Sequence, residues 1–295
     1  MISIIITAYK EEKTIGKAIK SITNQKIIED YEVLCVCPDK ETRDVIERYE
    51  RTNHKIKHVE DSGKGKPTAL NIAINNAKGD ILILTDGDVF VSDNSINKII
   101  KPFQNKEVGI VSGRPISLNP KENKWGYFSH LLTDLGAHQT RLNQTKKNKM
   151  IVCSGYLYAF RKDIIEKIPI DALAEDAVIS HMIFERGYKT AYAPNAKVFV
   201  KYPDNFKDWI IQKKRSAGGY NQLKFYIRKR ERMRSFPKEA LSVLRIFSYP
   251  KSIKEFFWTI GLIFLRLYLW SLIYKDINLK KKDLKEVWLR VESTK

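Results

Sequence analysis

Two aspartates separated by one glycine directly follow a short apolar run. In "GDILILTDGDVFV", the apolar residues 81–84 lead to Asp86, Gly87 and Asp88. Two carboxylates at the end of a buried strand are costly to hold there unless a cation lies between them. A hard divalent ion, bound by one or two carboxylates and by substrate phosphates, suits such a place. We therefore expect Asp86 and Asp88 to hold Mg²⁺ or Mn²⁺. The same residues also fit a simple polar turn without a metal ion.

A second carboxylate pair stands near the start of a predicted helix. Glu175 and Asp176 belong to "AEDAVISHMIFERG", which ends at Gly187. A helix dipole favours negative charge at this end, so we expect a lowered pKa and an ionised Asp176. An ionised aspartate can act as a general base toward a substrate hydroxyl, or it can cap the helix. These residues alone leave both roles open, with Glu175 as a structural partner.

The elements that must position these residues follow a regular pattern. Up to residue 115, short apolar runs alternate with helical segments, which predicts βαβ units and a mostly parallel, doubly wound α/β sheet. Strands are expected at "ISIIITAY", "YEVLCVC", "IKHVE", "DILILT" and "VGIVSG", and the first helix is expected to begin at Glu11 and Glu12. Ligands of such sheets bind beyond the carboxyl ends of the strands, where the strand order reverses. The candidate residues at these ends are Thr7, Ala8, Tyr9, Asp39, Asp86 and Asp88.

The pattern loosens between residues 119 and 149 and then resumes. "MIVCSGYLYAF" and "YKTAYAPNAKVFV" have strand character, and a helix is expected from about Asn205 through "WIIQKKRSAGG". Cys35, Cys37 and Cys153 fall in strand-like segments and lack the spacing of a disulfide framework or of two metal-binding pairs. We expect them to be reduced core residues.

A glycine-rich loop with two lysines precedes one of the predicted helices. In "SGKGKP" the flexible backbone could approach a phosphate, and Lys64 or Lys66 could contact it. The Lys-Ser or Lys-Thr pair of a P-loop is missing. A ligand contact and a solvated basic turn therefore both remain open.

Positive charge is concentrated in the last third of the chain. The protein has 295 residues and a net charge of +19. Residues 197–295 carry 24 Lys and Arg against 9 Asp and Glu, which leaves +4 for residues 1–196. We predict a globular domain over residues 1–220 and a basic module over residues 221–295 that meets a polyanion, either nucleic acid or an anionic membrane. No signal peptide is expected, because the first strand begins without a basic region.

The basic module contains a long apolar run. Residues 256–274, "FFWTIGLIFLRLYLWSLIY", include one charge, Arg266, and are long enough to span a bilayer. Aromatic residues at both ends are typical of a membrane interface. A spanning helix, a helix in the membrane plane and a helix of the soluble core all remain open. The neighbouring segments "PKEALSVLRIF", "LKEVWLRV" and "KFYIRKRERMR" suit a membrane surface.

Five sequence blocks occur in the order typical of one enzyme family. They are "ISIIITAYKEEKTIGKAIKSI", "GKGKPTALNIAINNAKGDILILTDGD", "CSGYLYAFRKD", "AEDAVISHMIFERGYKTAYAPNAKV" and "QKKRSAGG". With them, residues 1–220 resemble glycosyltransferase family 2, the inverting enzymes with the GT-A fold. The resemblance implies a nucleotide-diphosphate sugar as donor and Mg²⁺ or Mn²⁺ as cofactor.

The resemblance also implies roles for single residues. Asp176 is the expected catalytic base and Asp88 the expected metal ligand, while Asp86 faces the ribose and the metal. Two positions differ from the family pattern: Cys37-Pro38-Asp39 replaces adjacent aspartates, and Ser216 replaces the Trp of polymerising members. The expected donor contacts are Thr7, Ala8, Tyr9, Asp39, Lys66, Asp86, and the ends of a Gln-x-x-Arg motif, Gln212 and Arg215.

Together these features predict an inverting glycosyltransferase at the cell membrane, with its catalytic domain facing the cytoplasm. The expected acceptor is a hydroxyl or phosphate, lipid-linked or part of a growing surface glycan, and no nucleic-acid partner is expected. Two other classes remain. A sugar-phosphate nucleotidyltransferase is disfavoured because "TAYKEEKT" offers no glycine loop after the first strand. A non-catalytic nucleic-acid-binding protein is disfavoured because no recognition motif accompanies the basic residues.

Overall fold

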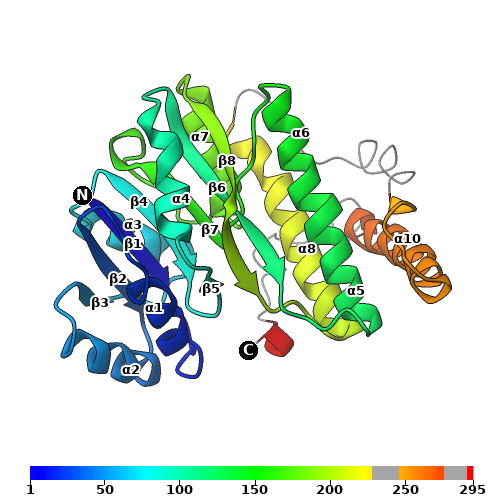
Figure 1. Cartoon of the computed structure of the whole chain (residues 1–295), viewed down its shortest axis with the longest axis horizontal. Helices are drawn as coiled ribbons and strands as arrows, with labels where there is room; N and C mark the ends of the chain where they lie inside the picture. The colour runs from blue at the N-terminus through cyan, green and yellow to red at the C-terminus, as the bar shows by residue number, and fades with distance from the viewer. Residues whose placement is uncertain (228–245, 276–290, 295) are drawn as a thin grey trace.

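The computed structural model describes residues 1–227, 246–275 and 291–294. An eight-stranded sheet runs through these residues in the order β3-β2-β1-β4-β7-β6-β8-β5, with helices on both faces (Figure 1). β7 is antiparallel to both of its neighbours and β5 is antiparallel to β8, whereas the other pairs are parallel. The strands are β1 (Ile2–Thr7), β2 (Tyr31–Cys37), β3 (Ile56–Glu60), β4 (Ile81–Asp86), β5 (Phe90–Val91), β6 (Val108–Ser117), β7 (Leu157–Arg161) and β8 (Lys189–Val200).

The predicted α/β class and mostly parallel sheet are confirmed. β2 and β3 cover the predicted segments residue for residue, and all three cysteines are free and buried. The helices are α1 (Ile15–Thr23), α2 (Lys40–Glu50), α3 (Lys66–Asn76), α4 (Ser95–Ile100), α5 (Lys124–Leu131), α6 (Thr140–Lys146), α7 (Glu175–Glu185), α8 (Phe206–Gln222) and α10 (Ile253–Tyr274), with a π-helix η2 (Leu132–Gln139) and short 3-10 turns η1 (Lys101–Gln104), η3 (Lys162–Ile164), η4 (Leu223–Phe225) and η7 (Glu292–Thr294).

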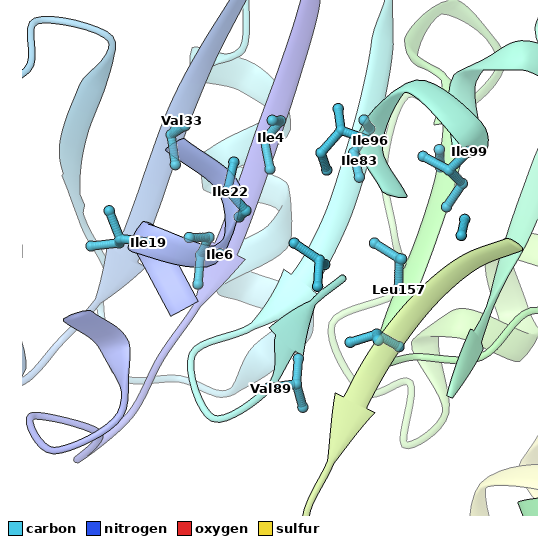
Figure 2. Close-up of a cluster of buried hydrophobic side chains, with 14 of the residues drawn as sticks. Ile4, Ile6, Ile19, Ile22, Val33, Ile83, Val89, Ile96, Ile99 and Leu157 are labelled. Atoms are coloured by element: carbon cyan, nitrogen blue, oxygen red, sulfur yellow. The ribbon is translucent and has the colours of Figure 1, made fainter. Parts of the chain in front are cut away.

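Alternate residues of the central strands contribute to two separate cores. In β1, Ile4 and Ile6 face the side of the sheet where Ile19 and Ile22 of α1 pack (Figure 2). Ile5 faces the other side and joins the cluster formed with α3 and α7. This explains the continuous apolar runs of the sequence, since a strand covered on both faces has no polar side. These two cores therefore support both faces of the sheet at the edge where β1 and β4 end.

The first helix begins one turn later than predicted. α1 starts at Ile15, so Glu11 and Glu12 precede it rather than lying in its first turn. The Glu11 N–H donates to the Thr42 hydroxyl at 2.9 Å, and the Thr14 N–H donates to the Glu11 carbonyl at 3.0 Å. These bonds close a separate turn between β1 and α1, which the apolar pattern alone does not reveal.

The segment before β7 has the sequence pattern of a strand but forms none. The prediction over "MIVCSGYLYAF" is therefore correct only for its last four residues, Leu157–Phe160, and β7 continues to Arg161. The reason lies in the backbone N–H groups, which donate to buried hydroxyls instead of to a neighbouring strand. These bonds run from Ile151 to Thr190 at 2.7 Å, from Cys153 to Ser180 at 3.0 Å and from Ser154 to Ser112 at 3.1 Å.

A layer of helices extends the fold beyond β6. Residues 119–149, where the pattern loosens, contain α5, η2 and α6, which follow one another as a long rod in Figure 1. α10 packs against both α5 and α8, and the hydroxyls of Tyr127 and Thr259 lie 2.7 Å apart in the buried interface. The apolar core formed by α5, α8 and α10 consists of Tyr127, Phe128, Leu131, Trp209, Leu262, Leu269 and Ile273.

α10 contains the predicted apolar run. Among the described residues it is the one helix long and apolar enough to cross a membrane, a criterion that the core helix of a soluble protein can also meet. The three surface segments predicted beside it lie mainly or wholly outside the described residues. The boundary expected at residue 220 falls within α8, and the division into two domains remains a prediction.

Gly79 allows the entry to β4 to approach β1 closely. A Cβ at this position would collide with the Ser3 nitrogen and lie 2.8 Å from the Ile2 Cα. We expect Gly79→Ala to lower the free energy of unfolding by about 3 kcal/mol, the upper part of the usual range for overpacking, as measured by urea denaturation. Gly261→Ala in α10 is the control, since a Cβ there meets nothing within 4 Å. Equal stability of both variants would contradict this interpretation.

Candidate active site

The candidate site lies where the strand order reverses. β2 and β3 extend the sheet on one side of β1, whereas β4 lies on the other side. Thr7 and Asp86, the last residues of β1 and β4, are register partners, and the Thr7 hydroxyl donates to Asp86 Oδ1 at 3.1 Å. Ligands of α/β sheets bind beyond the strand ends at such a reversal. The structure thus brings these two predicted residues together.

Lys66 forms the electrostatic centre of the site. Its Nζ lies 2.6 Å from Asp86 Oδ1 and 2.9 Å from Glu175 Oε1, and each of the three side chains is less than a quarter exposed. Burial alone would lower the pKa of Lys66, but the two carboxylates raise the pKa above its ordinary value. Lys66 is therefore charged and forms an ion-paired bridge at the start of α3, not a solvated turn. The cation found at Asp86 is this ammonium group.

Asp176 lies in the first turn of α7, as predicted. Its Oδ1 accepts from the Ala177 N–H at 2.8 Å, and a Cβ on Gly155 would lie 3.3 Å from its Oδ2. Burial and the charge of Glu175 raise the pKa of Asp176 to about 6, outweighing the N–H of Ala177 and the charge of Lys66. The predicted lowering of this pKa is therefore wrong, because desolvation exceeds the effect of the helix terminus. The carboxylate is ionised at neutral pH but binds a proton more readily than an ordinary aspartate.

α8 approaches this region through a close contact near α7. A Cβ on Gly219 would lie 2.6 Å from the Ala174 Cβ. Farther along the helix, Gln222 accepts from the Leu173 N–H at 2.8 Å and donates to the Asp171 carbonyl at 2.7 Å. These contacts fix the helix that carries the Gln-x-x-Arg motif next to the loop that leads to Asp176.

Tyr156 connects α8 to the strand ends and is absent from the predicted site. Gln212 Nε2 donates to the Tyr156 hydroxyl at 3.5 Å. Burial raises the pKa of Tyr156, and Arg215, Asp88, Asp86 and Lys66 act on it electrostatically. Tyr156 therefore lies within electrostatic range of these predicted residues. Its only signal in the sequence is its place in the block "CSGYLYAFRKD".

Gln212 presents a buried acceptor to the site. Its side chain is 8 % exposed, and among the described residues its Oε1 has no hydrogen-bond partner. An acceptor buried in this way costs about 1–3 kcal/mol. A ligand that donates a hydrogen bond here would remove that cost.

Asp39 has a structural role at the second strand end. It caps α2, accepting from the Thr42 N–H at 3.1 Å, and its other oxygen accepts from the Lys10 N–H at 2.8 Å. Burial raises the pKa of Asp39, but these hydrogen bonds outweigh burial and lower it. Beside it, Ala8 is buried and Tyr9 is 50 % exposed.

The carboxylates of the Asp-Gly-Asp turn fit a divalent cation by their chemistry, since both are hard oxygen donors. A Cβ on Gly87 would lie 2.9 Å from the Ala8 Cβ, so the glycine lets the turn pack closely against the end of β1. Among the described residues no group of three His, Cys, Asp or Glu gathers at one point.

Removal of the Lys66 ammonium should destabilise the protein. Lys66→Met leaves Asp86 and Glu175 close together without their shared cation, and we expect a loss of about 3 kcal/mol, the lower end for a broken buried ion pair. Urea denaturation measures the loss. Lys64→Met in the same loop is the control, because Lys64 is exposed. A Lys66→Met protein as stable as the control would contradict a structural role of the bridge.

The chain is similar to known glycosyltransferases. The family model "Glycosyl transferase family 2" matches residues 3–169. The probable glycosyltransferase YdaM of Bacillus subtilis is 27 % identical over 237 residues, which are 76 % of this chain and 56 % of that protein. A poly-beta-1,6-N-acetyl-D-glucosamine synthase of Staphylococcus epidermidis is 23 % identical over 229 residues, 75 % of this chain and 55 % of that protein. The chain therefore spans a little over half the length of these relatives.

Solved structures share the fold. The mannosyltransferase PcManGT of Pyrobaculum calidifontis, in complex with GDP-Man and Mn²⁺, has a TM-score of 0.63 and 18 % identity, covering 97 % of this chain and 82 % of its own. Glucosyl-3-phosphoglycerate synthase of Mycobacterium tuberculosis, in complex with Mn²⁺, UDP and phosphoglyceric acid, has a TM-score of 0.53 and 15 % identity, covering 78 % and 80 %. Because the family model matches more than half of the chain, this protein belongs to glycosyltransferase family 2.

Proposed function

We propose that this protein is an inverting glycosyltransferase that moves a sugar from a nucleotide-diphosphate sugar to a hydroxyl or phosphate acceptor. The observation that carries the proposal is the arrangement of Asp176 with the Lys66 bridge and the motif of α8 around one edge of the sheet. Membership of the family and neighbours solved with GDP-Man or with UDP and Mn²⁺ support it.

The donor nucleotide is proposed to lie at the ends of β1 and β4. Thr7, Ala8 and Tyr9 line the nucleoside pocket, with Asp39 and Lys66 at its margin and Asp86 toward the ribose. Asp88, together with Asp86, would hold Mg²⁺ or Mn²⁺, with donor phosphates as further ligands. When bound, the ion neutralises charge that develops on the departing diphosphate. Arg215 provides a further positive charge for that leaving group.

Asp176 is proposed to remove the proton from the acceptor. Inversion needs one group that takes this proton on the face opposite the leaving group. A pKa of about 6 keeps the carboxylate ionised at neutral pH while making it a stronger base than an ordinary aspartate. Gln212 Oε1, which is buried without a donor among the described residues, suits a hydroxyl of the sugar or acceptor better than a phosphate, since an ionised phosphate has no hydrogen to donate.

The basic part of the chain is proposed to meet an anionic membrane, with the catalytic part facing the cytoplasm. The net charge of +15 for residues 197–295 and the apolar α10 support this placement. It would bring a lipid-linked or surface-glycan acceptor to the site, and no nucleic acid is involved.

Replacement of the proposed base should affect turnover more than donor binding. Asp176→Asn keeps the oxygen that accepts from Ala177 but cannot take a proton, so we expect kcat to fall about 10²–10⁴-fold with donor affinity nearly unchanged. In the wild type, kcat should fall as the pH drops through about 6, because the carboxylate then binds a proton. Exposed Asp163→Asn is the matched control. Full turnover in a folded Asp176→Asn protein would support a cap instead.

The metal should act through Asp88. Titration calorimetry with UDP and with GDP, each in Mn²⁺ or in EDTA, should show at least about tenfold tighter binding of one nucleotide with Mn²⁺. Asp88→Asn should remove that difference, whereas Asp93→Asn, an exposed aspartate just beyond it, should retain it. Equal affinities with and without metal in the wild type would exclude a metal-dependent donor site here.

A further inference from the structure

α10 has two opposite apolar faces, and one is already packed. Leu262, Leu269 and Ile273 are buried at 1 %, 3 % and 6 % exposure against α5 and α8. The buried bond between the hydroxyls of Tyr127 and Thr259 fixes the same face. This side of the helix therefore belongs to the protein core.

The opposite face is exposed and uncharged. Phe257 and Phe264 are 65 % and 66 % exposed, and Tyr268 is 49 % exposed. They recur at helical spacing, so they form one continuous stripe. We call this stripe the aromatic ridge; its exposed positions are Phe256, Phe257, Gly261, Phe264, Leu267, Tyr268, Ser271 and Tyr274.

Arg266 lies on the packed side of α10, away from the ridge. It follows Leu262 by four residues and precedes Leu269 by three, which places the three residues on one helix face. Its side chain is partly buried. The charge that makes a spanning helix costly therefore does not oppose insertion of the ridge.

Positive charges border the ridge at both ends of α10. Lys251 and Lys254 are exposed at its start and Lys275 at its end. Phe206, the first residue of α8, is 49 % exposed and stacks on Tyr268 with ring centroids 6.2 Å apart. An apolar stripe with a basic border complements an anionic lipid surface, in which aromatic rings enter the interface and lysines meet the headgroups.

We propose that α10 lies in the plane of an anionic bilayer, with the aromatic ridge inserted and the opposite face still packed on α5 and α8. A spanning α10 would expose Leu262, Leu269 and Ile273 to lipid and break the Tyr127–Thr259 bond. In Figure 1, α10 lies on the outer side of α8, remote from β1 and β2. The docking itself is independent of the proposed reaction.

One consequence rests on the proposed function. Gln212 follows Phe206 by six residues of α8, a rise of about 9 Å along the helix. The site thus lies near the membrane surface, where the headgroup of a lipid-linked acceptor could enter it without leaving the bilayer.

Vesicle flotation of the full-length chain tests the docking without any assay of activity. We expect binding to vesicles containing 30 % phosphatidylglycerol and weaker binding to pure phosphatidylcholine, with release at high salt or alkaline pH. Phe257→Glu/Phe264→Glu should weaken binding at least about tenfold. The control is Ile28→Glu/Ile170→Glu, which changes two apolar residues that are 80 % and 64 % exposed elsewhere. No binding by the wild type, or equal binding by both double variants, would overturn the proposal.

Labelling distinguishes the in-plane helix from a spanning one. The native cysteines are buried, so Ser252→Cys and Lys275→Cys, at the two ends of α10, provide single reactive sites. When each variant is added to preformed vesicles, a membrane-impermeant maleimide should label both ends. Protection of one end would indicate a spanning helix and overturn the proposal. A dimer that dissociates in Phe257→Glu/Phe264→Glu, without lipid binding, would assign the ridge to a second copy of the chain and also overturn it.

Discussion

One ammonium group between two carboxylates sets the geometry on which the candidate site depends. Lys66 begins α3, Asp86 ends β4 and Glu175 begins α7, so the bridge joins three elements that are distant in sequence. Without it, Asp86, Glu175 and Asp176 would place three negative charges in one partly buried region. The same bridge fixes the start of α7 relative to the strand ends, and thereby positions Asp176.

The bridge also makes the donor site and the proposed base parts of one electrostatic system. Lys66 lowers the pKa of Asp176, while Glu175 raises it. A divalent ion held by Asp86 would share that carboxylate with the Lys66 ammonium, because Asp86 Oδ1 already contacts it. Changes in charge at the proposed donor site would therefore act electrostatically on the proposed base, through Lys66 and Glu175.

Much of the fold could be predicted from the sequence, because strands covered on both faces leave continuous apolar runs. The runs predict β2 and β3 residue for residue, and the rule that ligands bind beyond the carboxyl ends of the strands groups Thr7 with Asp86. The helices over residues 119–149 could not be predicted in this way, since α5 is buried around much of its circumference and has no clear apolar stripe. Tyr156 was missed for a different reason: its importance comes from contacts with α8, which a local pattern does not contain. The pKa of Asp176 depends on burial in the same way, so the helix position alone predicted the wrong direction.

The segment at residues 151–154 constrains how this protein can change during evolution. Its N–H groups depend on the side-chain hydroxyls of Thr190, Ser180 and Ser112 rather than on a neighbouring strand. Exchange of Ser for Thr keeps such a donor–acceptor pair, whereas Ala or Val leaves a buried N–H without its acceptor, at a cost of about 1–3 kcal/mol. Ser180 also donates to the Asp176 carbonyl at 2.6 Å. Substitutions at these three residues are thus limited, because each side chain holds a backbone N–H of the segment. At Ser180 a substitution would also remove the bond to the Asp176 carbonyl.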